Sequence, residues 1–345
     1  EWKSGARHDC NERESADESD VRGVLLTPTK IAMEGADVAM EESSGPLTSG
    51  AQGPFSTTAP DPAAAAQRAY ERAHRQYGAA DYDGARAACE EALRFRPSRT
   101  DVLLLLGACW FQLRDTDRCI ACNREALKID PSFAEAYGNL GNVLKELGEL
   151  DSAIELYRRA ISLRPTFVDA HANLAAAHMR KGEHAIAIAW YRSALQLNPG
   201  LADAHCNLGA LLRRAGDHEA AKRCFSQAIR LRPDSESAWK LLAATLKREG
   251  DLTNSIAAYR EAIRLKPDAD ACSNLGNALK EAGYVDEAID AYRDAIRLKP
   301  DFAIAFGNLA AVYYDRRQLA LAAQTYQQAV AIKPHFPDAY NVSAP

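Results

Sequence analysis

The stretch AEAYGNLGNVLKELGELDSAIELYRRAISLRP, residues 134–165, decides the fold. It contains two amphipathic helical patterns with a turn at Gly148 between them. A similar stretch follows at 168–199, VDAHANLAAAHMRKGEHAIAIAWYRSALQLNP, and another at 202–233, ADAHCNLGALLRRAGDHEAAKRCFSQAIRLRP. Consecutive copies of one helix–turn–helix segment predict an all-α repeat architecture.

A proline near the end of each copy reveals the period. Prolines stand at positions 97, 131, 165, 199, 233, 267, 300 and 334, so successive copies are 34 residues apart except for one gap of 33. The spacing predicts repeats over 63–336, as eight units at about 66–99, 100–133, 134–167, 168–201, 202–235, 236–268, 269–302 and 303–336. Residues 337–345 begin a further, truncated unit. Because a helical solenoid needs a polar cap after its last unit, we expect the natural protein to continue beyond Pro345.

Small and large residues recur at fixed places within the units. The first helix carries Gly or Ala at one position, as Gly107, Gly141, Ala175, Gly209, Ala243, Gly276 and Ala310. The second helix carries an aromatic residue, as Tyr157, Tyr191, Phe225, Tyr259, Tyr292 and Tyr326. Small residues let the paired helices approach closely, and the aromatic rings fill the remaining space. We expect a glycine to form the turn inside most units, and an Asp or Ser after each proline to cap the next helix.

This pattern resembles the tetratricopeptide repeat, whose period is also 34 residues, and the resemblance covers about 80% of the chain. The family fold implied is a right-handed superhelix, an α-solenoid of about eight helix pairs. Its usual activity is the binding of other proteins along the surface that the first helices line.

The first 62 residues differ from the repeats in composition and charge. They contain twelve acidic and five basic residues, whereas the whole chain has a net charge of −5, so the repeats are close to neutral. Such an acidic stretch, rich in Ser, Gly and Pro, is typical of a disordered tail. The sequence has no basic block for nucleic acid and no apolar run long enough for a membrane span. Eight irregularly spaced cysteines fit reduced thiols and a cytoplasmic or nuclear protein better than a disulfide framework.

One column of the first helices consists of asparagines: Asn139, Asn173, Asn207, Asn274 and Asn308. Asparagine is a weak helix former, so its recurrence is not explained by propensity. A carboxamide can pair with both the N–H and the C=O of an extended peptide backbone, which makes the column a predicted peptide-binding ladder. The column breaks at Leu105 and Leu241, and we therefore expect the binding groove to start near the third unit and to be interrupted at the sixth.

Four residues before this column stands an acidic one: Glu135, Asp169, Asp203, Asp270 and Asp338. Two interpretations are open. Asp169, Asp203 and Asp270 are candidate contacts for the bound peptide, or these acids only complement the helix dipole as solvated side chains.

The motifs AYGNLGNVLKELG and CSNLGNALKEAG, at 136–148 and 272–283, resemble the repeat region of protein O-linked N-acetylglucosamine transferase. The resemblance implies that the five asparagines, with Asp169, Asp203 and Asp270, hold substrate proteins. In that family a separate carboxy-terminal region transfers N-acetylglucosamine from UDP-GlcNAc to Ser or Thr. The sequence departs from the pattern at Leu105, Leu241 and Ile304, and it contains no catalytic region, so UDP-GlcNAc is expected only if one follows.

Other members of the repeat class remain as alternatives. A plant-type protein O-fucosyltransferase has similar repeats, and a free-standing scaffold would bind partner proteins without any enzyme. A chaperone-binding clamp needs paired Lys or Arg at the inner positions, which here carry acids and asparagines. The sequence leaves the oligomeric state open, a homodimer included.

No catalytic or metal site is expected in this chain. Phosphate-binding loops, zinc-protease motifs and nucleophile elbows are absent from the sequence. The acid pairs Asp81/Asp83, Asp115/Asp117 and Asp268/Asp270 fall at turns, where helix capping explains them. Cys119 stands in a small-residue slot, which indicates packing rather than a C-x-x-C site with Cys122, and His171 and His205 stand where other units have an aromatic residue.

Overall fold

The computed structural model describes residues 61–333, which divide into two compact units, 61–190 (unit 1) and 191–333 (unit 2). Residues 1–60 of the predicted tail at 1–62, the truncated unit at 337–345 and its Asp338 lie outside the described residues. The last two residues of the predicted tail, Asp61 and Pro62, instead begin the first described helix. Each unit is considered by itself below.

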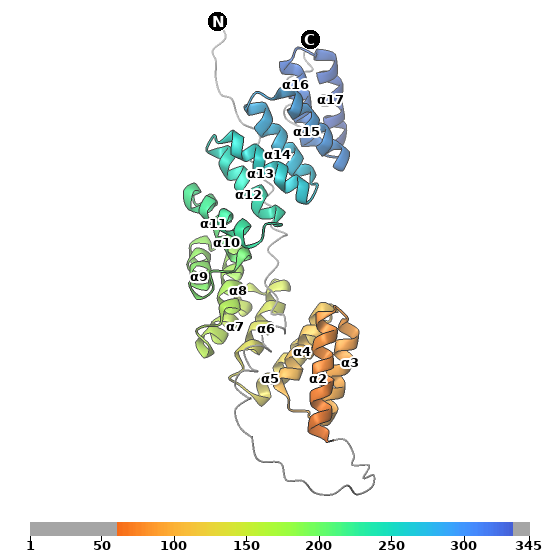
Figure 1. The fold of residues 1–345 in the computed structure, drawn as a ribbon, viewed down its shortest axis with the longest axis vertical. Helices are drawn as coiled ribbons and strands as arrows, with labels where there is room; N and C mark the ends of the chain where they lie inside the picture. Colours follow the sequence, from red (N-terminus) through yellow and green to blue (C-terminus); the bar gives the residue numbers. More distant parts are fainter. Residues whose placement is uncertain (1–60, 334–345) are drawn as a thin grey trace, which may run out of the picture. The chain divides into compact units, whose positions relative to one another are not determined.

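The described residues form helices and no strands, so the predicted all-α fold is confirmed (Figure 1). Unit 1 contains α2 (Pro62–Gly78), α3 (Tyr82–Phe95), α4 (Thr100–Gln112), α5 (Thr116–Ile129), α6 (Ala134–Glu146), α7 (Leu150–Leu163) and α8 (Val168–Arg180). The division falls within α9 (His184–Leu197). Unit 2 contains α10 (Ala202–Arg214), α11 (His218–Leu231), α12 (Glu236–Arg248), α13 (Leu252–Leu265), α14 (Ala269–Glu281), α15 (Val285–Leu298), α16 (Ala303–Asp315) and α17 (Leu319–Ile332).

The helices pack in antiparallel-type pairs, such as α4 with α5 and α14 with α15. The first helices of successive pairs also contact each other. In unit 1, for example, α4 contacts α6, and in unit 2 α14 contacts α16. The even-numbered helices therefore form a continuous surface within each unit, which we call the first-helix face. None of the helices within 61–333 is both long and apolar enough to cross a membrane.

Close contact between a glycine and an aromatic ring holds several pairs together, as predicted. A Cβ on Gly141 would lie 2.6 Å from the ring of Tyr157, one on Gly209 2.7 Å from Phe225, and one on Gly276 2.5 Å from Tyr292. These rings are fully buried. Only a residue without a side chain lets the two backbones approach so closely at these places without a shift.

The turn inside each pair requires a left-handed residue. Five glycines take it, with φ between 82° and 87°: Gly148, Gly182, Gly216, Gly250 and Gly283. The predicted glycine turn is thus confirmed in these pairs. In the others Ala80, Arg114 and Arg317 occupy the same place with φ of 59°, 63° and 61°, which is a strained conformation for residues with a Cβ.

The expected capping of the first helices was mostly wrong. Among the first helices, only Asp61, Ser235 and Asp268 accept a hydrogen bond from the backbone of the helix that follows them. Phe133, Phe167 and Phe302 occupy the equivalent place in other pairs and make no cap bond. These rings pack instead into apolar clusters between neighbouring helices, so burial of the ring replaces the cap.

Candidate peptide-binding face

The five predicted asparagines all lie on first helices, but their surroundings differ. Unit 1 contains Asn139 on α6 and Asn173 on α8, and unit 2 contains Asn207, Asn274 and Asn308 on α10, α14 and α16. Asn173 is only 2% exposed, Asn274 is exposed, and the other three are half-buried. The column is thus not a uniform row of accessible carboxamides.

Three of these side chains are bonded within the chain. The Oδ1 atom of Asn173 accepts from Nζ of Lys145 at 3.3 Å, and Nδ2 of Asn207 donates to the Tyr191 hydroxyl at 3.1 Å. Nδ2 of Asn308 donates to Oγ of Ser273 at 3.4 Å. Asn139 and Asn274 make no side-chain hydrogen bond to any residue in 61–333. Since a carboxamide has two donors and an acceptor, the half-buried Asn207 and Asn308 keep capacity for a ligand.

The acidic column is partly engaged in ion pairs. Asp203 forms a two-pronged pair with Arg232, at 2.7 and 3.1 Å, and Glu135 pairs with Arg164. Each base follows the second helix of the same pair, 29 residues after the acid. Asp169 is buried, at 6% exposure, and Asp270 is exposed. The structure therefore gives Asp203 an internal partner that the two interpretations from sequence did not include.

Lys145 is a buried cation beside the asparagine column that sequence reasoning missed. It is 2% exposed on α6, and desolvation lowers its pKa to about 8; the charge of Arg180 acts in the same direction, and that of Glu146 opposes it. Nη1 of Arg180 donates to the carbonyl oxygen of Lys145 at 2.6 Å.

A signal for Lys145 was present in the sequence. The equivalent lysines in unit 2, Lys247 and Lys280, pair with an acid on the next first helix, namely Glu281 at 2.9 Å and Asp315 at 3.1 Å. In unit 1 the corresponding residue is Arg180, so Lys145 has no acid in that place.

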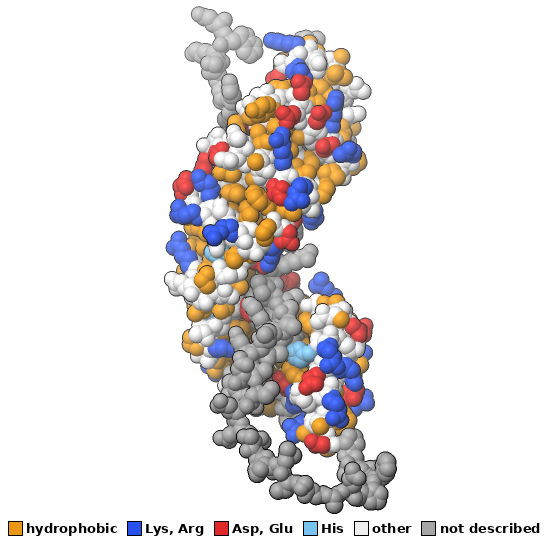
Figure 2. All heavy atoms as spheres, viewed as in Figure 1, with side chains coloured by type: hydrophobic (Ala, Val, Ile, Leu, Met, Phe, Trp, Pro, Cys, Tyr) orange, Lys and Arg blue, Asp and Glu red, His pale blue; other side chains and the backbone are white. Residues whose placement is uncertain are grey.

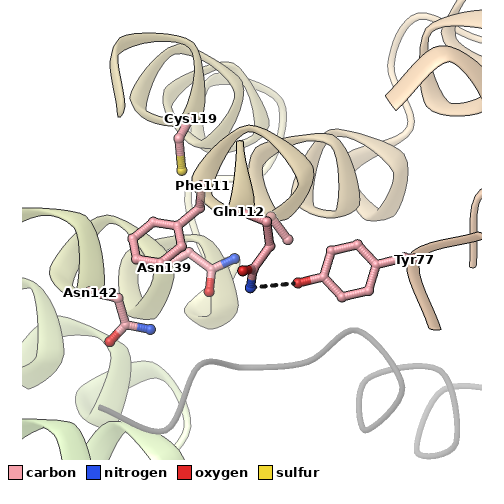
Figure 3. Close-up of a pocket in the computed structure, with 7 residues that line it drawn as sticks. Tyr77, Phe111, Gln112, Cys119, Asn139 and Asn142 are labelled. Carbon is pink, nitrogen blue, oxygen red and sulfur yellow. Dashed lines mark hydrogen bonds between the residues drawn. The ribbon is translucent and has the colours of Figure 1, made fainter. Parts of the chain in front are cut away.

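A small pocket lies on the first-helix face of unit 1 (Figure 3). Its lining consists of Tyr77, Ala108, Phe111, Gln112, Cys119, Asn139 and Asn142. Figure 3 shows Asn139, Gln112 and Phe111 gathered together, with Asn142 at one end and Tyr77 at the other. Nε2 of Gln112 donates to the Tyr77 hydroxyl at 3.4 Å. The structure thus brings the predicted Asn139 together with Asn142, which the sequence analysis did not select.

Asn142 carries a buried donor without a partner. The side chain is 4% exposed, and its Oδ1 accepts from the Tyr157 hydroxyl at 2.7 Å. Its Nδ2 finds no hydrogen-bond partner among residues 61–333. Because an unpaired buried donor is costly, this atom is the clearest polar irregularity on the face.

Comparison with known families identifies the repeats. Models described as tetratricopeptide or TPR repeats match residues 70–134, 122–155, 141–182, 167–234, 206–270 and 276–316. Together they cover 70–316 except for 271–275. The chain is a tetratricopeptide repeat protein. Tetratricopeptide repeats build protein-binding scaffolds, and these models describe the repeat itself, with no link to glycosyl transfer.

Solved structures show the same fold. This tetratricopeptide repeat chain resembles a chain of the APC/C hetero-tetramer Cut9–Hcn1 at 21% identity and a TM-score of 0.54, over 76% of this chain and 52% of that one. It therefore spans about half the length of that relative. PilF of Pseudomonas aeruginosa is similar at 24% identity and a TM-score of 0.54, over 58% and 92% of the two chains. YrrB, titled a TPR protein with an unusual peptide-binding site, is similar at 22% identity and a TM-score of 0.49, over 53% and 95%. No characterised protein matches by sequence.

The remaining polar residues of the repeats have structural roles. Asp81, Asp115 and Asp268 each cap a helix, as predicted. Nε2 of His171 lies 2.9 Å from the Pro165 carbonyl oxygen, and Nε2 of His205 lies 3.0 Å from that of Pro199, just as the Trp239 indole N–H donates to Pro233. Cys119 is buried, and desolvation raises its pKa to about 12. Within 61–333 no cluster of His, Cys, Asp or Glu could hold a metal ion.

Proposed function

We propose that this tetratricopeptide repeat chain binds extended segments of partner proteins on the first-helix face of each unit. The observation that carries the proposal is the carboxamide column, in which Asn139 and Asn274 have no hydrogen bond within the described chain. Both stand at a helix position where alanine would be more favourable. Their unused donors and acceptors match the alternating N–H and C=O groups of an extended backbone.

The half-buried Asn207 and Asn308 extend this surface beside Asn274 in unit 2. In unit 1 Asn173 lies on α8, the next first helix after that of Asn139, but it is only 2% exposed and is bonded to Lys145. Recognition of backbone groups requires little from the ligand's side chains, which suits a scaffold with several partners. Asp169, Asp203 and Asp270 remain candidate contacts, with Asp203 already paired to Arg232.

Charge on the visible surface is mixed rather than of one sign. Figure 2 shows basic and acidic side chains interspersed over the visible surface. Within this mixture, neutral carboxamides are suited to hold neutral peptide groups. Partners are therefore expected to be unstructured protein segments rather than nucleic acid or membrane.

Binding is tested on the full chain with fluorescently labelled unstructured peptides. The double variant Asn139→Ala/Asn274→Ala removes the two carboxamides that have no internal bond, so the helices should be preserved. We expect peptide affinity to fall about tenfold or more, since each carboxamide supplies up to two hydrogen bonds. The control is Asn254→Ala, an exposed asparagine on the second helix α13, which should leave affinity unchanged. Equal affinity of wild type and the double variant would overturn the ladder.

A narrower proposal concerns the role of this binding. The motifs around Asn139 and Asn274 support a substrate-recruiting part of a protein O-linked N-acetylglucosamine transferase, present in the cytoplasm or nucleus, with UDP-GlcNAc used by a separate catalytic region. The alternatives are a free-standing scaffold and the repeat region of a plant-type protein O-fucosyltransferase. Sequencing the transcript beyond the Pro345 codon separates them. A following nucleotide-sugar region supports the transferase, and a stop codon supports the scaffold.

A further inference from the structure

The pocket of unit 1 exists because one ring is missing from the repeat pattern. Asn123 on α5 stands where the six later pairs have an aromatic residue. A Cβ on Gly107 would lie 2.7 Å from Nδ2 of Asn123, much as a Cβ on Gly141 would lie 2.6 Å from Cε1 of Tyr157. The Asn123 amide therefore replaces the near edge of the ring and leaves the space of its far end unfilled.

The position of the pocket agrees with this geometry. In the next pair the far end of the ring, the Tyr157 hydroxyl, reaches Asn142 on α6. The residue equivalent to Asn142 one repeat earlier is Ala108 on α4, and Ala108 lines the pocket, as does Cys119 from the helix of Asn123. The cavity volume is only about 20 Å³, and the cavity is partly open to solvent. Because one water molecule already needs ~10–15 Å³, the pocket admits a single small polar group rather than a cofactor.

The lining specifies the chemistry of that side chain. Nδ2 of Asn142 is a buried donor in need of an acceptor, and Asn139 supplies both donors and an acceptor beside it. Phe111, Ala108 and Cys119 provide apolar contact. Among residues 61–333 the lining contains no charged side chain, so a carboxylate or an ammonium group would lose its hydration without a counter-charge from them. A purely aliphatic side chain would leave the Asn142 donor unpaired.

We propose that this pocket binds a carboxamide side chain, that of Gln or Asn, from the partner segment held on the first-helix face. The carbonyl oxygen of the guest accepts from Nδ2 of Asn142, and its amide group donates to Oδ1 of Asn139. The aliphatic stem of the guest packs on Phe111. This inference rests on the proposed peptide binding and adds one requirement to it, namely that the bound segment contains a Gln or Asn at this place.

Unit 2 contains the matched residue, Asn277 on α14. Asn277 accepts from the Tyr292 hydroxyl at 2.7 Å, the same bond that Asn142 makes with Tyr157. Asn277 is half-buried, and its Nδ2 is not an unsatisfied buried atom. Asn142→Asp and Asn277→Asp therefore form a matched pair of variants, because each keeps the oxygen that accepts from tyrosine and removes the N–H donor.

The test uses a host peptide of Gly and Ser with one guest residue: Gln, Asn, Ala, Leu or Glu. For the wild-type full chain we expect Gln or Asn to bind about tenfold more tightly than Ala, the worth of one or two hydrogen bonds in a buried site. Asn142→Asp should abolish this preference, and Asn277→Asp should retain it. Asn123→Phe should fill the pocket, raise the melting temperature and remove the preference while the Ala peptide still binds as to wild type.

The outcomes separate the two proposals. If no host peptide binds, and Asn139→Ala/Asn274→Ala changes nothing, peptide binding itself is wrong. If the peptides bind through the column but all guests bind equally, or Leu or Glu binds best, the carboxamide pocket is wrong and the proposed function stands. If Asn123→Phe fails to fold, the comparison of Asn142→Asp with Asn277→Asp still tests whether the pocket binds a carboxamide side chain. Propionamide, a small carboxamide, gives a further test that needs no peptide. It should raise the melting temperature of the wild type but not that of Asn142→Asp.

Discussion

The pair α14–α15 of unit 2 and the pair α4–α5 of unit 1 follow the same repeat but are filled differently. In α14–α15, Gly276 packs on the buried ring of Tyr292, and the ring's hydroxyl donates to Asn277. In α4–α5, Gly107 packs on Asn123, whose Oδ1 is buried without a partner. The core of α14–α15 is therefore complete, whereas the core of α4–α5 lacks a ring and has a pocket beside it. A single residue of a repeat can thus convert a packing position into a binding position without altering the helices.

The largest expected effect concerns the residues at this shared position. Tyr292→Ala removes a fully buried ring and should lower the free energy of unfolding by about 3–5 kcal/mol. Asn123→Ala should change it by less than about 1 kcal/mol, because the loss of the bond to the Cys119 carbonyl is offset by loss of the unpaired Oδ1. Urea denaturation followed by circular dichroism measures both. Similar losses for the two variants would contradict the view that α4–α5 lacks a complete core.

A second difference between the units lies in the partner of a lysine. Lys280 in unit 2 meets Asp315, whereas Lys145 in unit 1 meets Arg180 and has its pKa lowered to about 8 by desolvation. An unfolded lysine keeps its proton up to its ordinary value of 10.5. Between these pH values the unfolded chain binds a proton that the folded chain has lost, so folding stability rises with pH. The contribution of Lys145 is thus complete above the unfolded pKa and is lost as pH falls through about 8.

Two variants measure this contribution. The wild-type free energy of unfolding, relative to that of Lys145→Gln, should rise by about 2–3 kcal/mol between pH 7 and 11. The buried thiols titrate in both proteins, so subtracting the free energy of unfolding of Lys145→Gln from that of the wild type at each pH removes their contribution. Arg180→Asp gives Lys145 the acid that Lys280 has, so it should stabilise the chain at pH 7 and suppress the rise. A flat difference curve for Lys145→Gln would show that Lys145 is protonated alike in both states.

The turns of the same two pairs give a smaller effect. Arg114 in α4–α5 has φ of 63°, and Gly283 in α14–α15 has φ of 86°. Arg114→Gly should stabilise the chain by about 1 kcal/mol, and Gly283→Ala should destabilise it by a similar amount, because only glycine adopts this region without strain. A Cβ on Gly283 would have open space around it, so steric overlap plays no part. Thermal unfolding of both variants checks the opposite signs; a loss on Arg114→Gly would mean that its side-chain contacts outweigh the strain.

Most of the fold could be predicted because it depends on periodic local signals. The proline spacing placed the helices, and the glycine column located the contacts of Gly141 and Gly276 with their rings. Caps were less predictable, since Phe167 and Phe302 precede their helices and are buried by neighbours that belong to other parts of the chain.

The candidate site depended more on tertiary contacts. The sequence identified the asparagine column but not that Lys145, Tyr191 and Ser273 bond three of its members, since these partners come from other helices. The pocket did leave a readable signal, because Asn123 stands at a position that carries an aromatic residue in each of the six later pairs. The sequence did not predict that Asn142, in the repeat after that of Asn123, would have an unpaired donor.

The smallest expected effect on stability separates the two interpretations of the acidic column. Asp203 pairs with Arg232 in unit 2, and both side chains are about half exposed, at 47% and 50%. Arg232→Met should therefore change the free energy of unfolding by less than about 0.5 kcal/mol, as for other exposed pairs. Its effect on peptide binding is the informative quantity. If Asp203 contacts the ligand, loss of Arg232 releases its carboxylate, and Asp203→Asn should then weaken binding more in the Arg232→Met background than in wild type. If Asp203→Asn leaves peptide binding unchanged in both backgrounds, Asp203 serves only its partner arginine, and the asparagines remain the binding column of unit 2.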